Sequence, residues 1–143
     1  MNVIIDTNVI LDDILNRTPN VTDARRITEL VTEGKIAGHI SANSITDIYY
    51  VTDKKHGDDV AKDVIRGLLQ SFSIVAIGGE ACLAALDKPM DDFEDALVAV
   101  CAENANLNYI ITNDKAFLDL DLPVPSINPT DFLTVYAGLV GDK

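Results

Sequence analysis

The 143-residue sequence has few cysteines and no long apolar run. Its only cysteines, Cys82 and Cys101, lie in segments of helical periodicity, so two buried free thiols are expected in preference to a disulfide. No segment approaches the roughly 18 consecutive apolar residues of a membrane span. The N-terminus has neither the basic start nor the long apolar run of a signal peptide. These absences predict a cytoplasmic protein whose residues 1–143 form a single domain.

Histidine and the common nucleotide-binding patterns are equally scarce. His39 and His56 are the only histidines, and neither lies near another group of metal-ligating residues, which argues against a zinc site of the Cys/His type. The pair Gly78-Gly79 lacks the spacing of a P-loop or a dinucleotide-binding loop. The sequence contains no Gly-x-Ser-x-Gly elbow. The chemistry of this protein must therefore come from other residue types.

Positive charge is the third deficit. The chain has 11 Lys and Arg residues against 23 Asp and Glu residues, for a formal net charge of −12. Residues 1–71 contain 8 of the basic and 11 of the acidic residues, whereas residues 72–143 contain 3 and 12. Tight nonspecific binding to nucleic acid or to an anionic membrane requires the opposite balance. The acidity therefore predicts bound metal ions, a basic partner, or both.

Apolar runs and helical periodicities alternate along the whole chain. The predicted strands are residues 2–6, 36–41, 72–77, 108–112 and 123–127. The predicted helices are residues 8–15, 22–33, 44–55, 58–70, 79–87, 92–105 and 115–119, with a last helix opened by Thr130. This alternation predicts an α/β fold with three α/β/α layers and a mainly parallel central sheet. In such sheets, ligands bind at the carboxyl ends of the strands.

Four aspartates fall where strand and helix ends are expected to meet at that edge. Asp6 ends the first strand and Asp114 closely follows the fourth, while Asp47 and Asp95 lie in the first turns of helices. Converging carboxylates repel one another and raise each other's pKa values. A hard divalent cation such as Mg²⁺ or Mn²⁺ removes that conflict, because it prefers oxygen ligands. The pattern therefore predicts a metal-dependent hydrolase that acts on a phosphodiester.

Several of these aspartates also have a local structural alternative. Asp6 could be the N-cap of the following helix, although Asn8 could fill that role equally and leave Asp6 free. Asp114 could be a turn residue. Asp47 could do no more than form a capping box with Ser44. For all three aspartates, the predicted position at one sheet edge favours a role in the site.

Asp95 shares a helical stripe with the apolar residues Val98 and Ala102, so its carboxylate is predicted to point toward the core. A carboxylate in that position needs a partner. Asp92 is predicted to cap the same helix, with a supporting role in the site as the alternative. Thr112 could orient a carboxylate or a water molecule by hydrogen bonding.

Four segments carry these residues: Ile4-Ile5-Asp6-Thr7-Asn8, Ser44-Ile45-Thr46-Asp47-Ile48-Tyr49-Tyr50, Asp92-Phe93-Glu94-Asp95-Ala96-Leu97-Val98-Ala99 and Tyr109-Ile110-Ile111-Thr112-Asn113-Asp114-Lys115-Ala116-Phe117. Together they resemble the PIN domain family, which includes the VapC-type toxin ribonucleases. Each motif is weak by itself, but their order and spacing together are fairly specific. The resemblance covers nearly the whole chain.

The resemblance implies a PIN-like fold and a metal-dependent endoribonuclease, with the toxin of a toxin–antitoxin pair as one form of it. Asp6, Asp95 and Asp114 match the family's acidic site and would hold one or two Mg²⁺ or Mn²⁺ ions. Asp47 would support them, at a position where the family usually carries glutamate. Further supporting residues would be Asn8, Asp92 and Thr112. The resemblance also implies an RNA substrate, a basic antitoxin and a homodimer.

Two other functions are compatible with these residues. A phosphatase of the haloacid dehalogenase type would use Asp6 as its nucleophile, but Asn8 stands where such enzymes usually have a second aspartate. A catalytically weak or inactive PIN-fold protein-interaction module would fit the acidic surface and the aspartate at position 47.

The basic residues and two tyrosines have alternative interpretations as well. If RNA binds, the phosphate contacts are expected among Arg17, Arg25, Arg26, Lys54, Lys55 and Arg66. Their alternative is an ordinary solvated surface. Of Tyr49 and Tyr50, one is expected to pack in the core, and the other could stack on a base at the rim of the site.

Overall fold

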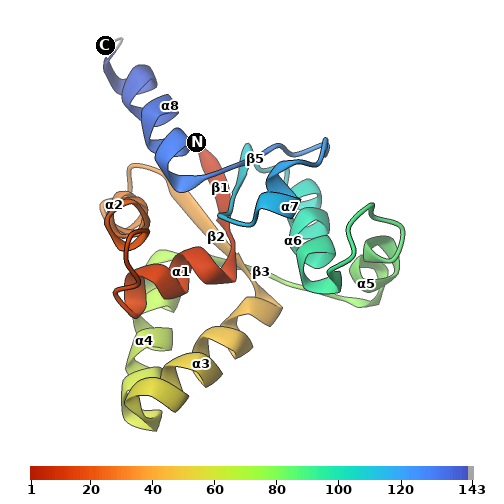
Figure 1. Cartoon of the computed structure of the whole chain (residues 1–143). Coiled ribbons are helices and arrows are strands. Elements are labelled where there is room, and N and C mark those ends of the chain that lie inside the picture. The colour runs from red at the N-terminus through yellow and green to blue at the C-terminus, as the bar shows by residue number, and fades with distance from the viewer. Residues whose placement is uncertain (142–143) are drawn as a thin grey trace.

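The computed structural model describes residues 1–141 and contains one central sheet (Figure 1). Its strands are β1 (Asn2–Ile5), β2 (Ala37–Ser41), β3 (Ser73–Val75), β4 (Tyr109–Ile111) and β5 (Ser126–Ile127). The strand order is β3-β2-β1-β4-β5, and every neighbouring pair is parallel. This arrangement confirms the predicted α/β fold with a parallel sheet.

Helices cover both faces of this sheet, as Figure 1 shows. They are α1 (Thr7–Ile14), α2 (Val21–Thr32), α3 (Ala42–His56), α4 (Asp58–Ser71), α5 (Gly79–Ala85), α6 (Phe93–Asn104), α7 (Lys115–Leu118) and α8 (Pro129–Gly141). Core residues from α1, α2, α3, α4 and α8 pack together on one face. Residues from α6 and α7 pack on the other, which gives the three layers.

The central strand β1 is apolar without alternation from Val3 to Ile5, and its position in the sheet explains why. Val3 and Ile5 point into the core formed with α1 and α2, whereas Ile4 points into the core formed with α6. Successive side chains of a strand face opposite sides, so a strand covered on both faces must be apolar at every position. Its register pairs Ile5 with Ile111 of β4. The residues after these two strands therefore emerge side by side.

Most predicted elements are present, but the predicted start of α3 is wrong. The helix begins at Ala42, directly after β2, and not at Ser44. Ser44 is therefore the third residue of the helix, within its first turn, where its hydroxyl bonds the Ser41 hydroxyl at 2.8 Å instead of capping a backbone N–H. The predicted capping box with Asp47 does not form. β5 is also shorter than predicted, because only residues 126–127 pair with β4.

The two cysteines are free, as predicted; Cys101 is buried and Cys82 is half-buried. Burial raises the pKa of the Cys101 thiol to about 11, which keeps it protonated and unreactive near neutral pH. Within residues 1–141, no helix has the length and apolar character needed to cross a membrane.

Candidate active site

A cavity of about 250 Å³ lies beyond the carboxyl ends of β1 and β4. It brings together all four predicted aspartates: Asp6, Asp47, Asp95 and Asp114. Two further acidic side chains, Asp92 and Glu94, also line it. The rest of its wall includes Thr7, Asn8, Asn43 and Ser44. Among the lining side chains there is no cation, so the carboxylates face one another without an opposing charge.

Asp6 is the buried member of this group. It follows β1 directly, and its backbone N–H donates to the Ile111 carbonyl at 2.9 Å. Its Oδ1 accepts a hydrogen bond from the Thr7 N–H at 2.9 Å, and its Oδ2 accepts one from Thr112 Oγ1 at 3.0 Å. Asp6 is thus the N-cap of α1, which decides between Asp6 and Asn8, the two residues that the sequence offered for this role. Capping uses one carboxylate oxygen, and the other is held by Thr112.

The environment of Asp6 disfavours its charge. Burial raises its pKa above the ordinary aspartate value, and the nearby charges of Asp114 and Asp92 act in the same direction. Hydrogen bonds from Thr112 and Thr7 lower the pKa but do not outweigh burial. A positive charge in the cavity would relieve this conflict.

Thr112 connects Asp6 to Asp114. The Thr112 hydroxyl donates to Asp6 and accepts a hydrogen bond from the Asp114 N–H at 3.1 Å. Asp114 is exposed, and its Oδ1 accepts a hydrogen bond from the Ala116 N–H at 3.0 Å at the start of α7. One buried hydroxyl therefore fixes the positions of two carboxylates that come from different strands.

Asp92 and Asp95 enter the cavity from the start of α6. Asp92 is its N-cap, and its Oδ1 accepts hydrogen bonds from the N–H groups of Glu94 at 2.8 Å and Asp95 at 3.2 Å. This confirms the predicted capping role. Asp95 faces inward, on the same stripe as the buried residues Val98 and Ala102. The cap thus sets where the helix begins and how Asp95 enters the cavity.

Asp95 has the most strongly raised pKa of the group. Burial and then the charges of Asp6, Asp92 and Asp114 raise its pKa to about 7, and a hydrogen bond with Asp114 adds to the shift. With a pKa of about 7, this carboxyl group is only about half ionised at neutral pH, and a cation in the cavity would favour its charged form. The hydrogen bonds in the cavity therefore do not stabilise all of the negative charge that its carboxylates carry.

Asp47 and Glu94 meet across the cavity from α3 and α6. Burial raises the pKa of Glu94, and the charges of Asp47 and Asp92 and a hydrogen bond with Asp47 add to it. Glu94 was not among the predicted site residues, because a glutamate in the first turn of a helix usually interacts with the helix dipole. The one feature of the sequence that pointed to Glu94 as a site residue was its position two residues after Asp92.

Asn43 is a second residue that the sequence argument missed. It lines the cavity one turn before Asp47, and its Oδ1 is buried without a hydrogen-bond partner within the described residues. A buried amide oxygen of this kind normally has a partner. Nearby, Thr7 Oγ1 donates to Ser44 Oγ at 2.7 Å, which joins the start of α1 to α3.

The donor chemistry of the cavity fits a hard divalent cation, because every polar side chain that lines it can offer an oxygen ligand. The unpartnered Asn43 oxygen is a further donor of the same type. Within residues 1–141, however, no three His, Cys, Asp or Glu side chains already stand in an arrangement that could hold an ion. The donor set fits, and its side chains must turn toward a shared ion to complete a site.

The sequence pattern of the PIN domain family matches residues 2–116, and the chain belongs to this family. A relative, Ribonuclease VapC1 of Aquifex aeolicus (strain VF5), is 28% identical over 127 residues, which cover 85% of this chain and 88% of that protein.

Two solved structures share the fold. VapBC2 from Rickettsia felis, bound to a DNA fragment from its promoter, matches with a TM-score of 0.67 at 16% identity, over 90% of this chain and 98% of that chain. VapC20 of Mycobacterium tuberculosis, a Sarcin-Ricin loop cleaving toxin, matches with a TM-score of 0.65 at 13% identity, over 80% of this chain and 92% of that chain. These likenesses confirm the predicted PIN fold.

Proposed function

We propose that this protein is a metal-dependent endoribonuclease that hydrolyses RNA phosphodiester bonds. The observation that carries the proposal is the meeting of Asp6, Asp95 and Asp114 in one cavity at the carboxyl edge of a parallel sheet. The ribonuclease name of the VapC1 relative supports the substrate class. Membership of the PIN family leaves the phosphatase alternative without support.

In this proposal, Asp6, Asp95 and Asp114 hold Mg²⁺ or Mn²⁺, and Asp47 supports them from α3. When bound, the ion stabilises charge on the phosphate and acidifies the attacking water. Thr112 keeps Asp6 directed into the cavity through its hydrogen bond to Oδ2. Asp92 keeps the first turn of α6 in place, and with it Asp95. Asn8 lies at the exposed part of the wall.

We also propose a basic antitoxin partner and a homodimer. The net charge of −12 supports a basic partner, because opposite charges favour association. A toxin–antitoxin complex from Klebsiella pneumoniae, which shares the fold with a TM-score of 0.66 at 19% identity, supports such a partner. For the homodimer, Leu83 and Leu86 at the end of α5 are each 68% exposed and supply apolar surface of the kind that interfaces cover.

Two observations favour a second candidate function, a PIN-fold interaction module without strong catalysis. The carboxylates do not yet form a ligand set of three, and Asp47 has a shorter side chain than glutamate. In that case the acidic cavity would receive a basic side chain of a partner. Metal binding without cleavage of RNA would favour this alternative.

The deciding experiment is cleavage of a panel of structured and single-stranded RNAs by the purified protein in Mn²⁺ or Mg²⁺. EDTA and Asp95→Asn should each abolish cleavage. Asp121→Asn, the same change at an exposed loop residue, should leave it intact. Equal cleavage by the wild type and Asp95→Asn would show a contaminating nuclease and reject the assigned site.

A further inference from the structure

Helix α3 leads from the acidic cavity to an exposed surface. Its residues Asn43, Asp47, Tyr50 and Lys54 are spaced by three or four positions, which places them on one stripe of the helix. Asn43 and Asp47 line the acidic cavity. Tyr50 is 64% exposed, and Lys54 is exposed one turn further on. An exposed aromatic ring and a cation therefore follow the Asp47 carboxylate along the same stripe of α3.

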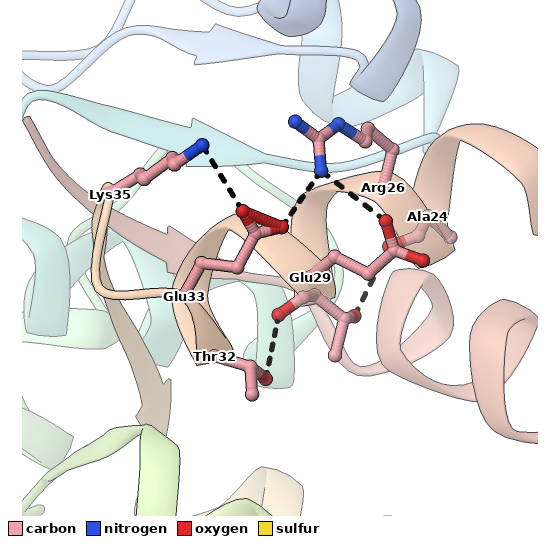
Figure 2. A network of polar contacts seen from close by, with 7 residues as sticks. Ala24, Arg26, Glu29, Thr32, Glu33 and Lys35 are labelled. Carbon is pink, nitrogen blue, oxygen red and sulfur yellow. Dashed lines mark hydrogen bonds and ion pairs between the residues drawn. The ribbon is translucent and has the colours of Figure 1, made fainter.

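Lys54 also differs from most other cations of the protein. Within residues 1–141, ion pairs with described carboxylates engage every Lys and Arg except Lys54, Lys55 and Lys115. The opposite case is found at the end of α2, where Arg26 and Lys35 both pair with Glu33 (Figure 2). Arg26 Nη1 lies 3.0 Å from Glu33 Oε1, and Lys35 Nζ lies 3.2 Å from Glu33 Oε2. Lys54 has no described carboxylate to compete with an incoming anion.

A groove of about 480 Å³ lies between α3 and α4, beside this stripe. It is lined by Ile45, Thr46, Tyr49, Tyr50, Lys62, Ile65 and Arg66. The rings of Tyr49 and Tyr50 meet edge to face with their centroids 5.8 Å apart, and Tyr49 donates a hydrogen bond to Asp58. The groove thus combines an apolar floor, an ordered pair of aromatic rings and two cations.

The two cations of the groove can also reach an anion. Lys62 pairs with Asp58 and Arg66 with Asp63, each at 3.0 Å, and all four side chains are more than half exposed. Exposed pairs between neighbouring helical residues are weak, so a phosphate can displace them. The acidic cavity repels a polyanion, and cations beside the cavity that hold the flanking phosphates of an RNA strand offset this repulsion.

We propose that the α3–α4 groove, together with Tyr50 and Lys54, binds the single-stranded RNA that flanks the bond to be cleaved. A base stacks on the exposed ring of Tyr50, and a phosphate lies against Lys54. Lys62 and Arg66 hold the next phosphate. Stacking on an aromatic ring accepts any base, so this contact supplies affinity and register rather than sequence choice. The inference rests on the proposed nuclease function, because it takes RNA as the substrate.

The test is binding of a fluorescently labelled, single-stranded RNA oligonucleotide of mixed sequence, followed by anisotropy in EDTA, where cleavage cannot occur. Tyr50→Ala should weaken binding by about tenfold, and Tyr50→Phe, which keeps the ring, should bind as the wild type does. Lys54→Ala should reduce the slope of log affinity against log salt concentration by about 0.7, the loss of one phosphate contact. Lys62→Ala and Arg66→Ala together should reduce it by about the same amount, because these two side chains share one phosphate in this proposal.

Lys35→Ala is the matched control, since it removes the same charge from an ion-paired lysine near the end of α2 and should leave both affinity and slope unchanged. Wild-type affinity in Tyr50→Ala and Lys54→Ala would overturn the inference, as would an absence of RNA binding by the wild type at low salt. If the variants instead lost self-association in sedimentation and kept RNA binding, the α3–α4 groove would be an interface with a second copy of the chain, and the inference would again fail. The nuclease proposal is judged separately: RNA binding on this face without metal-dependent cleavage would reject the nuclease and keep the RNA site.

Discussion

Thr112 Oγ1 donates a hydrogen bond to Asp6 Oδ2 over 3.0 Å, across the boundary between β1 and β4. The two residues are 106 positions apart in the sequence and become neighbours only through the parallel register of these strands. The bond is buried, so water cannot replace it. The candidate site therefore depends on a side chain that holds a carboxylate and need not itself contact a metal or RNA.

Thr112→Val keeps the shape of this side chain and removes its hydroxyl. Because Asp6 is buried and would lose a donor, we expect the free energy of unfolding to fall by about 1–3 kcal/mol. RNA cleavage should fall as well, since one oxygen of Asp6 would no longer be fixed. Urea unfolding and cleavage assays measure the two effects.

Thr134→Val is the matched control for that change, because the Thr134 hydroxyl is exposed and bonds only its own helix, at the Thr130 carbonyl. We expect a stability change within about 0.5 kcal/mol for this variant. Thr112→Ser should retain most of the stability and activity. Equal stability of Thr112→Val and the wild type would contradict the assigned role.

Asp92 offers a test that separates capping from metal binding. Asparagine caps a helix as well as aspartate does, so Asp92→Asn should keep the wild-type stability and most of the activity. Asp92→Ala lacks the cap and should lose about 1 kcal/mol of unfolding free energy. If Asp92→Asn were stable but inactive, the carboxylate charge of Asp92 would be needed in the site itself, and capping would be only part of its role.

The raised pKa of Asp95 predicts how the stability of the metal-free protein varies with pH. The pKa of Asp95 is about 7 in the folded protein. In the unfolded chain, an aspartate has a pKa of about 3.9. The unfolded state therefore binds fewer protons between these values, and the contribution of Asp95 to stability falls as the pH rises from about 4 to about 7. Saturating Mg²⁺ should remove most of this loss.

Thermal unfolding in EDTA across that pH range, compared with Asp95→Asn, isolates the contribution. The variant should show a flatter profile than the wild type. Glu33, whose pKa is lowered by hydrogen bonds from Lys35 and Arg26, is the same in both proteins and does not affect the comparison. A wild-type profile parallel to that of Asp95→Asn would show that Asp95 is not desolvated.

Glu94 should strengthen cation binding, because it adds a carboxylate opposite Asp47. Glu94→Gln keeps the size of the side chain and removes its charge. We expect Mg²⁺ or Mn²⁺ affinity to fall about fivefold, which corresponds to about 1 kcal/mol for one charge at short range in a wet cavity. Calorimetric titration measures it. Asp119→Asn, an acid-to-amide change at a residue that does not line the cavity, is the control and should bind the metal as the wild type does.

Gly38 in β2 provides a prediction about the fold alone. A Cβ atom at this position would lie 2.6 Å from Val31 Cγ2 and 2.9 Å from the ring of Phe72. Both neighbours are buried, so Gly38→Ala should cost about 1–3 kcal/mol of unfolding free energy. Gly67→Ala, inside α4 with open space around its Cα, should instead stabilise the protein by about 0.5–1 kcal/mol. Chemical denaturation of both variants gives the comparison.

The sequence predicted the central strands of the sheet well because they are buried on both faces. Such strands read as short apolar runs, and the segment Val3-Ile4-Ile5 is one of them. It predicted caps less well. Asp6 caps α1 in place of Asn8, and Ser44 bonds Ser41 and Thr7 instead of opening α3. Several residues near a helix start can cap it, and the choice depends on where the preceding strand ends.

By itself, the sequence determined the order of strands and helices and the place of aspartates next to their ends, because hydrophobic period and turn chemistry are local properties. Only the tertiary structure decided that Glu94 faces Asp47, that the Asn43 oxygen lacks a partner, and that Thr112 holds Asp6. Each of these depends on strand register and on the rotation of one helix against another. Packing between residues far apart in the chain sets both, and no short segment of sequence contains that information.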